Sequence, residues 1–231
     1  NLKTLEERYK EYMGNKRKTL NGSGLQLEEV EPLTKNQLIA FESEKNLVLH
    51  GVAGTGKTFI SCYLAFDDMV KKQYSNLVII RSAVPTRDIG FLPGSEKEKA
   101  SVYEEPYKEV ANELFNRGDA YQILKTKGLV HFMTTSYIRG ITLKDSVILI
   151  DECQNMTFQE LDSIITRVGK YCRVMFCGDF EQSDLKNNGL MSFIRILETM
   201  GAFDMVNFEV QDIVRSDFVK EYLIAKKEIG L

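Results

Sequence analysis

From residue 32 onward the chain alternates short, continuous apolar runs with longer stretches of helical spacing. The runs are rich in Val, Ile and Leu, which is typical of strands that are buried on both faces. Such strands, separated by helices, predict an α/β protein with a mostly parallel sheet and helices on both faces. The predicted strands cover residues 46–50, 76–80, 129–133, 146–150, 172–176 and 205–209, and the predicted helices cover 57–73, 101–117, 157–168, 189–200 and 216–228.

The beginning of the chain has a different character. Residues 1–20 are highly charged and place leucine and tyrosine at a loose helical spacing, which predicts a helix. The NGSG segment at 21–24 is typical of a turn or a linker. We therefore expect a helical N-terminal arm with its linker (1–31), outside the core, and one globular domain (32–231).

Composition and charge narrow the class of protein. Hydrophobic residues make up 43% and charged residues 27% of the chain, so the composition is that of a folded protein. No apolar stretch is long enough to span a bilayer, and the first residues lack the apolar core of a signal peptide, which predicts a cytoplasmic location. A net charge of −3 does not indicate nucleic-acid binding by the whole surface, but it is compatible with a local basic groove.

The cysteines and histidines argue against a zinc-type metal site. The four cysteines have no C-x-x-C spacing and lie mostly in segments predicted to be buried, which favours reduced thiols in the core. Both histidines lie inside apolar, strand-like runs. Any metal is therefore expected to have oxygen ligands. These residues are Cys62, Cys153, Cys172, Cys177, His50 and His131.

The GVAGTGKT segment lies between a predicted strand and a predicted helix. Gly51, Gly56, Lys57 and Thr58 match the G-x-x-x-x-G-K-S/T pattern of a phosphate-binding loop in the context that this pattern requires. Glycines let the backbone point N–H groups at a polyphosphate, and the positive end of the next helix favours the anion. The alternative is a tight strand-to-helix turn. The residues expected to bind the nucleotide in this loop are Gly51, Val52, Ala53, Gly54, Thr55, Gly56, Lys57 and Thr58.

Two catalytic roles and a metal site follow from this loop and from the SVILIDECQN segment at 146–155. We expect Lys57 to reach the β- and γ-phosphates and Thr58 to bind Mg²⁺. Asp151 ends an apolar strand and would hold the same Mg²⁺ or its water. The adjacent Glu152 can act as the general base toward the attacking water. The alternative is a strand that merely ends in solvated acids.

Two glutamines are further candidates. Gln182, in CGDFEQSDL after the next strand, could sense the γ-phosphate and orient the water. Gln37, in TKNQ at the start of a helix, offers both a donor and an acceptor to adenine, although a surface amide is the alternative. No N-K-x-D segment for guanine follows the loop, so ATP is the expected nucleotide.

A long polar segment, residues 81–99, interrupts the alternation of strands and helices. Such loops in compact domains are frequently functional. Its Arg81, Arg87 and Phe91, together with Arg139 in YIRG, are candidates for contacts with phosphates and bases. The alternative is that these are solvated loop residues.

Taken in order, nine segments over roughly residues 32–228 resemble the PhoH-like ATPases, relatives of superfamily 1 helicases. The RSAVPTRDIGFLPG segment is most similar to phage-encoded members, whereas bacterial members commonly have Arg-Pro where Arg81-Ser82 stands here. For a phage-encoded protein the cytoplasm would be that of a bacterial host. The segments are TKNQ, GVAGTGKT, IGFLPG, VYEEPYKE, YIRG, VILIDECQN, TRVG, GDFEQSDL and VQDIVRSDFV.

This resemblance implies a single RecA-like core that hydrolyses ATP, a homo-oligomeric ring such as a hexamer, and action on single-stranded RNA or DNA. It also implies that Arg215 contacts the γ-phosphate and that Arg167, in TRVG, lies near the site. From the residues alone, an arginine before an apolar helix is more often a surface residue. A monomeric helicase needs two such cores, so a motor of this length requires a neighbouring subunit, and an arginine acting in trans becomes natural.

Three functions are compatible with the sequence. The first is a nucleic-acid-dependent ATPase or helicase assembled from single cores. The second is an ATP-gated switch or scaffold that binds protein partners through its N-terminal helix. The third is a phosphotransferase that acts on a small substrate. This third function lacks support, because no lid-like cluster of arginines is evident in the sequence.

Overall fold

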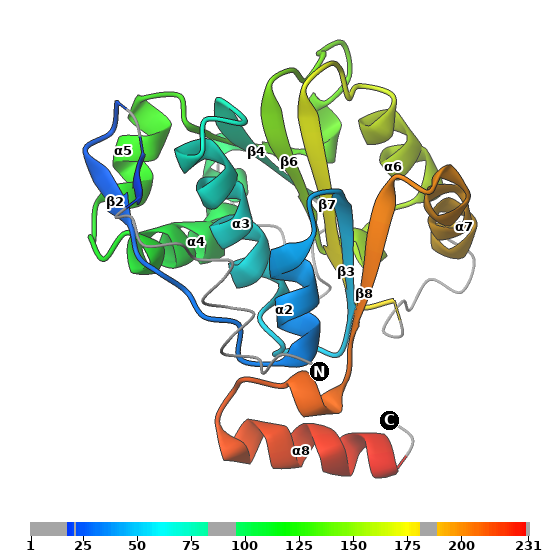
Figure 1. Cartoon of the computed structure of the whole chain (residues 1–231). Coiled ribbons are helices and arrows are strands. Elements are labelled where there is room, and N and C mark those ends of the chain that lie inside the picture. The colour runs from blue at the N-terminus through cyan, green and yellow to red at the C-terminus, as the bar shows by residue number, and fades with distance from the viewer. Residues whose placement is uncertain (1–17, 21, 83–95, 181–188, 230–231) are drawn as a thin grey trace, which may run out of the picture.

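The computed structural model describes residues 18–20, 22–82, 96–180 and 189–229, and its centre is a six-stranded parallel sheet (Figure 1). The strand order is β5-β4-β6-β7-β3-β8. All six predicted strands are present, shifted by at most a few residues at their ends. Their bounds are β3 (Asn46–Gly51), β4 (Asn76–Arg81), β5 (Val130–Thr134), β6 (Ser146–Asp151), β7 (Cys172–Gly178) and β8 (Phe203–Phe208).

Helices cover both faces of this sheet (Figure 1), as the sequence predicts. One face carries α2 (Lys35–Glu42), α3 (Lys57–Val70), α4 (Glu96–Leu114) and α5 (Ala120–Thr126), and the other carries α6 (Phe158–Ile165) and α7 (Leu190–Met200). The sequence did not predict α5, because its seven residues complete too few turns to show a helical period. The last helix, α8 (Asp217–Glu228), stands apart from the sheet at the lower end of Figure 1.

The core is divided between the two faces, and successive residues of each strand alternate between them. In β6, Val147 and Leu149 pack beneath α3 and α4, whereas Ile148 and Ile150 face α6 and α7. All four side chains are fully buried. The apolar runs are therefore continuous rather than alternating because neither face of the sheet meets water.

The interpretation of residues 1–31 as a helical arm outside the core is wrong where the structure describes this part. A hairpin of β1 (Lys18–Leu20) and β2 (Leu25–Leu27) replaces the end of the expected helix. Leu20, Leu25 and Leu27 are buried with the core residues of α3. The apolar side chains alternate with polar ones, so an extended chain can bury them together, whereas a helix would separate them. Residues 1–17 lie outside the described part.

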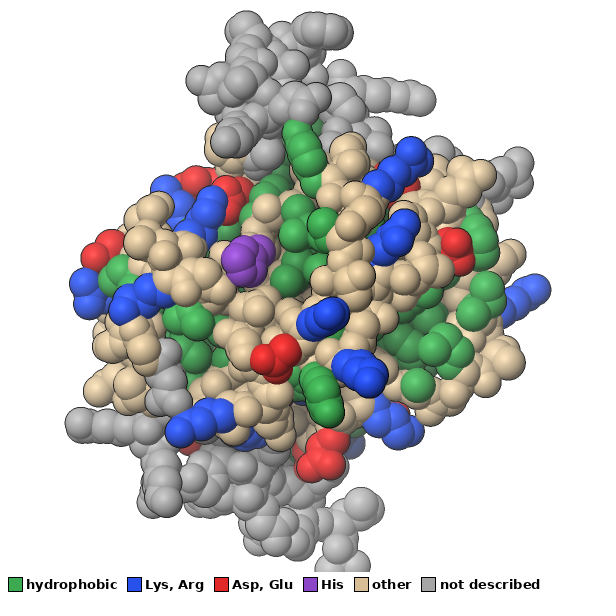
Figure 2. Space-filling view, turned by 90° about the horizontal axis from the view of Figure 1, so that it is seen from above, with side chains coloured by type: hydrophobic (Ala, Val, Ile, Leu, Met, Phe, Trp, Pro, Cys, Tyr) green, Lys and Arg blue, Asp and Glu red, His purple; other side chains and the backbone are tan. Residues whose placement is uncertain are grey.

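The strands of the sheet are parallel, so all of them begin at one edge and end at the opposite edge. The strands begin at the upper edge of Figure 1 and end at the lower edge, toward α8. Figure 2 looks onto the upper edge, where Lys and Arg side chains lie dispersed among acidic, hydrophobic and polar groups. Ligands of open parallel sheets bind at the edge where the strands end, so we expect a binding site at the lower edge.

Two further expectations concern burial. The thiols are free as expected, and Cys62, Cys153 and Cys177 are buried while Cys172 is half-buried. Among the described residues, none of the helices combines the length and the apolar character that crossing a lipid bilayer requires.

Candidate nucleotide-binding site

The GVAGTGKT loop connects the end of β3 to the start of α3 at the lower edge of the sheet. It begins where β3 passes very close to β8. Gly51 has a φ of +117°, and a Cβ there would lie 2.0 Å from the carbonyl oxygen of Phe208. The same carbonyl accepts a 3.0 Å hydrogen bond from the N–H of Val52. Only glycine fits this position, so the first glycine of the motif is required for the path of the backbone.

The Lys57 side chain folds back onto this loop. Its Nζ donates hydrogen bonds of 2.8 Å to the carbonyl oxygens of both Gly51 and Val52. Burial lowers the pKa of Lys57, while the nearby Cys177 and Asp179 act in the opposite direction. The ammonium group therefore lies at the mouth of the loop, where a bound polyphosphate could replace the two carbonyls as its partner.

Thr58 at the start of α3 and Asp151 at the end of β6 come together. The Thr58 hydroxyl lies 3.2 and 3.1 Å from the two carboxylate oxygens of Asp151. The buried hydroxyl of Tyr107, from α4, donates to the same carboxylate at 2.8 Å. Burial raises the pKa of Asp151, as does the charge of Glu152, whereas the Tyr107 hydrogen bond opposes this shift. A hydroxyl and a carboxylate are oxygen ligands that suit Mg²⁺.

Glu152 points away from this pair because its backbone changes direction at the end of β6. Its φ and ψ of 54° and 39° are left-handed. Its Oε2 accepts a 2.5 Å hydrogen bond from the Gln154 amide, whose oxygen in turn accepts from the N–H of Asp179 at 3.2 Å. The amide thus ties the expected general base to the end of the neighbouring strand β7.

Gln37 is not a surface amide, which the sequence left as the alternative. The residue is only 4% exposed. Its oxygen accepts from the N–H of Leu33 at 2.7 Å, and its nitrogen donates to the carbonyl of Thr55 at 3.2 Å. Gln37 therefore connects the start of α2 to the loop, and its predicted contact with adenine stays a prediction.

Arg215 lies against the loop of its own chain. The N–H of Val214 donates to the carbonyl of Gly54 at 3.1 Å, and a Cβ at Gly54 would come within 3.0 Å of Arg215 Cγ. The side chain is exposed. The structure thus brings together two ends of the domain that the sequence could not relate.

Arg81 also lies at the nucleotide site. It ends β4 and is the register partner of Asp151 in β6. Its guanidinium lies 5.7 Å from the ring centre of Tyr103 in α4. The Arg81 side chain is half-buried among groups of the nucleotide site. Its predicted contact with nucleic acid stays a prediction.

Arg139 is exposed just beyond the 3₁₀ turn that follows β5, and it lines a groove of about 400 Å³. The groove lies between the 3₁₀ turn after β5 and the start of α6, and its other lining residues are Thr135, Ser136, Thr157, Gln159, Glu160 and Ser163. Arg87, Phe91 and Gln182 lie outside the described residues.

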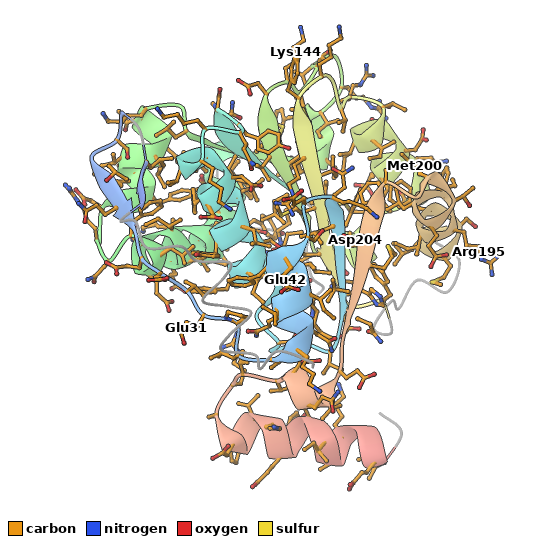
Figure 3. All side chains as sticks on the ribbon, in the orientation of Figure 1. Glu31, Glu42, Lys144, Arg195, Met200 and Asp204 are labelled. Atoms are coloured by element: carbon orange, nitrogen blue, oxygen red, sulfur yellow. The ribbon has the colours of Figure 1, made fainter. Side chains whose placement is uncertain are left out.

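The expectation that Arg167 lies near the site is wrong for the site of its own chain. Its carbonyl accepts from the N–H of Leu143, and the N–H of Gly169 donates to the Leu143 carbonyl. Leu143 precedes β6, so about 20 Å of strand separates Asp151 from Leu143 and from the Arg167 segment paired with it. In Figure 3 the nearby Lys144 is labelled at the upper end of the molecule. Because α6 runs back against the direction of the strands, the TRVG segment after it returns to the edge where they begin.

Sequence reasoning missed two residues that hold the acidic groups. Tyr107 lies in VYEEPYKE, a segment that was noted for its resemblance but given no role. The signal that could have found it is its spacing of four from Tyr103, which puts two tyrosines on one face of a helix. Gln154 lies two residues after Glu152 and carries no comparable signal, because only the turn after β6 brings the two side chains together.

The glycine loop after β3, the acid at the end of β6 and the intervening strand β7 define a P-loop nucleotide-binding protein with a RecA-like core. The sequence of the chain matches the family model described as "PhoH-like protein" over residues 29–226. The chain therefore belongs to the PhoH-like family, which confirms the resemblance. The likeness to phage-encoded members stays a prediction.

Two bacterial relatives illustrate the match. The chain is 31% identical over 206 residues to a PhoH-like protein of Mycobacterium leprae, covering 86% of this chain and 59% of the relative. It is 31% identical over 193 residues to Protein PhoH of Escherichia coli K12, covering 81% and 54%. The chain thus spans little more than half of the length of these relatives.

A solved structure supports the fold alone. The large terminase of the thermophilic bacteriophage D6E, in complex with ADP, superposes with a TM-score of 0.52 at 13% sequence identity. The match covers 83% of this chain and 49% of that chain.

Proposed function

We propose that this protein is a Mg²⁺-dependent ATPase whose hydrolysis is coupled to single-stranded RNA or DNA in the cytoplasm. The observation that carries the proposal is the pairing of the Thr58 hydroxyl with the Asp151 carboxylate beside the loop that ends in Lys57. A hydroxyl and a buried carboxylate suit Mg²⁺, and the backbone N–H groups of the adjacent glycine-rich loop suit the phosphates of a nucleoside triphosphate.

Each residue of the nucleotide site would have a distinct role in ATP hydrolysis. The loop from Gly51 to Thr58 wraps the phosphates, and Lys57 exchanges its two carbonyl partners for phosphate oxygens. Thr58 and Asp151 would hold Mg²⁺, which would supply positive charge to neutralise the phosphates. Glu152, fixed by the Gln154 amide, accepts the proton of the attacking water. Gln182 assists in orienting that water.

Nucleic acid would bind near the same edge of the sheet. Arg139 and the hydroxyl and amide groups of its groove can contact phosphates and sugars. The resemblance to helicase relatives supports a single strand as the substrate, with Arg81, Arg87 and Phe91 as further candidates.

We also propose that the protein acts as a homo-oligomeric ring, because a single RecA-like core would contact a nucleic-acid strand from one side only. Within this ring, the contact of Arg215 with Gly54 supports an arginine that acts on the nucleotide of its own subunit. In this role the guanidinium would stabilise the negative charge that develops on the γ-phosphate.

A second candidate function, an ATP-gated switch that binds a protein partner, is supported by α8. Phe218 and Tyr222 lie four residues apart on this helix and are 79% and 62% exposed. Large exposed apolar side chains on one helix face favour a protein partner. In this function hydrolysis would be slow and independent of nucleic acid.

The distinguishing experiment measures ATP hydrolysis with and without single-stranded RNA or DNA, at several salt concentrations. We expect stimulation by a single strand that weakens as salt rises, because phosphate contacts release counterions. Hydrolysis that no single strand stimulates would support the switch instead. An absence of any Mg²⁺-dependent hydrolysis would refute the ATPase proposal itself.

A further inference from the structure

We infer that Tyr107 is a positioning residue that holds the Asp151 carboxylate in the orientation required for metal binding. This inference rests on the proposed function, because it concerns the same metal site. Its basis is the 2.8 Å hydrogen bond that the Tyr107 hydroxyl donates to Oδ2 of Asp151. Both residues are buried, at 1% and 4% exposed, so water does not compete strongly for this contact.

The hydroxyl is held in place because α4 lies across the ends of two strands. Tyr103 and Tyr107 are four residues apart and therefore share a face of α4. Tyr103 lies beneath the guanidinium of Arg81 at the end of β4, and Tyr107 meets Asp151 at the end of β6. The Tyr107 ring also packs against Phe132 at a centroid distance of 5.8 Å. A ring packed on this side leaves its hydroxyl little freedom.

The direction of Asp151 explains why a tyrosine of α4 can reach it. Asp151 follows Val147 and Leu149 at a spacing of two, so its side chain lies on the face of the sheet that α3 and α4 cover. Thr58 approaches the carboxylate from α3, and Tyr107 approaches it from α4. The carboxylate is therefore held between two helices rather than by its own strand.

The two donors have different roles. The Thr58 hydroxyl oxygen is itself an expected metal ligand. Tyr107 has no such role, and its donation to Oδ2 can persist throughout the ATPase cycle. Groups that hydrogen-bond a ligating carboxylate orient it, and their loss typically weakens metal affinity by about 10- to 100-fold. Tyr107 fits this description, whereas a tyrosine that only filled the core would leave metal affinity unchanged on conversion to phenylalanine.

The chain supplies a matched control in Tyr121. This residue of α5 is 4% exposed, and its hydroxyl donates to a carboxylate oxygen of Glu104 at 2.6 Å. Tyr121→Phe likewise removes a hydroxyl that donates to a carboxylate, although this carboxylate is half-buried and also pairs with Lys125. Glu104 takes no part in the nucleotide site. A comparison of Tyr107→Phe with Tyr121→Phe therefore separates the effect on the site from the general cost of removing a buried hydroxyl.

The test uses the full chain and Mn²⁺ as the metal probe, with binding measured by electron paramagnetic resonance in the presence of ADP. We expect Tyr107→Phe to bind Mn²⁺ about 10-fold or more weakly than the unchanged protein and Tyr121→Phe to match it. ADP affinity measured in EDTA should be the same in all three proteins, because the loop is intact.

The outcomes separate the inference from the function on which it rests. Equal Mn²⁺ affinity in Tyr107→Phe and the unchanged protein would overturn the inference, as would a matching loss of ADP affinity in EDTA. Failure of the unchanged protein to bind Mn²⁺ with ADP would overturn the proposed function as well. In an Asp151→Asn background, Tyr107→Phe should have no further effect on Mn²⁺ binding. A further loss there would mean that Tyr107 acts through another group.

Discussion

A Cβ on Gly51 would lie 2.0 Å from the carbonyl oxygen of Phe208, so the last residue of β3 and the last residue of β8 approach as closely as a glycine permits. This approach sets the direction in which the phosphate loop leaves the sheet. It also makes the loop dependent on a strand that lies far along the chain.

Gly51→Ala should therefore destabilise the fold. A methyl group would meet a backbone oxygen at a residue with a φ of +117°, and we expect a loss of about 3 kcal/mol in the free energy of unfolding. Urea denaturation measures this loss. The control is Gly118→Ala, where a Cβ would meet no atom within 4 Å. Equal stability of the two variants would contradict the close approach.

Lys57→Ala should leave the fold intact and reduce ATP hydrolysis by about 100-fold or more, because the variant loses the charge placed at the phosphates. Hydrolysis is measured under saturating ATP, and circular dichroism monitors the fold. Lys108→Ala, at an exposed pair with Glu105, is the control for loss of a lysine. Turnover close to that of the unchanged protein would remove the loop from the catalytic site.

Glu152→Gln should separate binding from chemistry. Thr58 and Asp151 keep their contact in this variant, so we expect ATP to bind with Mg²⁺ while hydrolysis falls by about 100-fold or more. Single-turnover kinetics and equilibrium binding give the two quantities. A parallel loss of nucleotide affinity would assign Glu152 to metal binding or to structure instead.

Arg139→Ala should weaken the binding of a single strand and reduce the dependence of affinity on salt by about one counterion. Fluorescence anisotropy with labelled single-stranded RNA and DNA at several salt concentrations measures both effects. The matched control is Arg195→Ala, an exposed arginine of α7 that is labelled in Figure 3. If both variants bind alike, the groove beside Arg139 does not hold nucleic acid.

Arg215→Ala should lower hydrolysis, and a mixture with Lys57→Ala should not recover activity. The reason is that Arg215 contacts Gly54 of its own chain, so each mixed site would still lack one of the two groups. The measurement is turnover in mixtures that native mass spectrometry shows to co-assemble. Recovered activity would mean that Arg215 completes the site of a neighbouring subunit.

Sequence by itself determined the features that depend on neighbouring positions. The continuous apolar run SVILI predicts a strand buried on both faces, and β6 is fully buried. The GVAGTGKT motif predicts its own loop because left-handed backbone angles at Gly54 and Gly56 are local properties of glycine. The ordered motifs were also sufficient to predict the family, since they record local chemistry.

Only the tertiary structure decided which distant segments meet. Leu20 is buried because the hairpin of β1 and β2 packs on α3, and Arg167 lies away from the site because α6 reverses the chain. The hydroxyl of Tyr107 reaches Asp151, 44 positions later, because α4 lies across the ends of β4 and β6. The number of residues between two distant segments carries no information on such contacts, because helix packing and strand order, rather than local backbone preference, bring the side chains together.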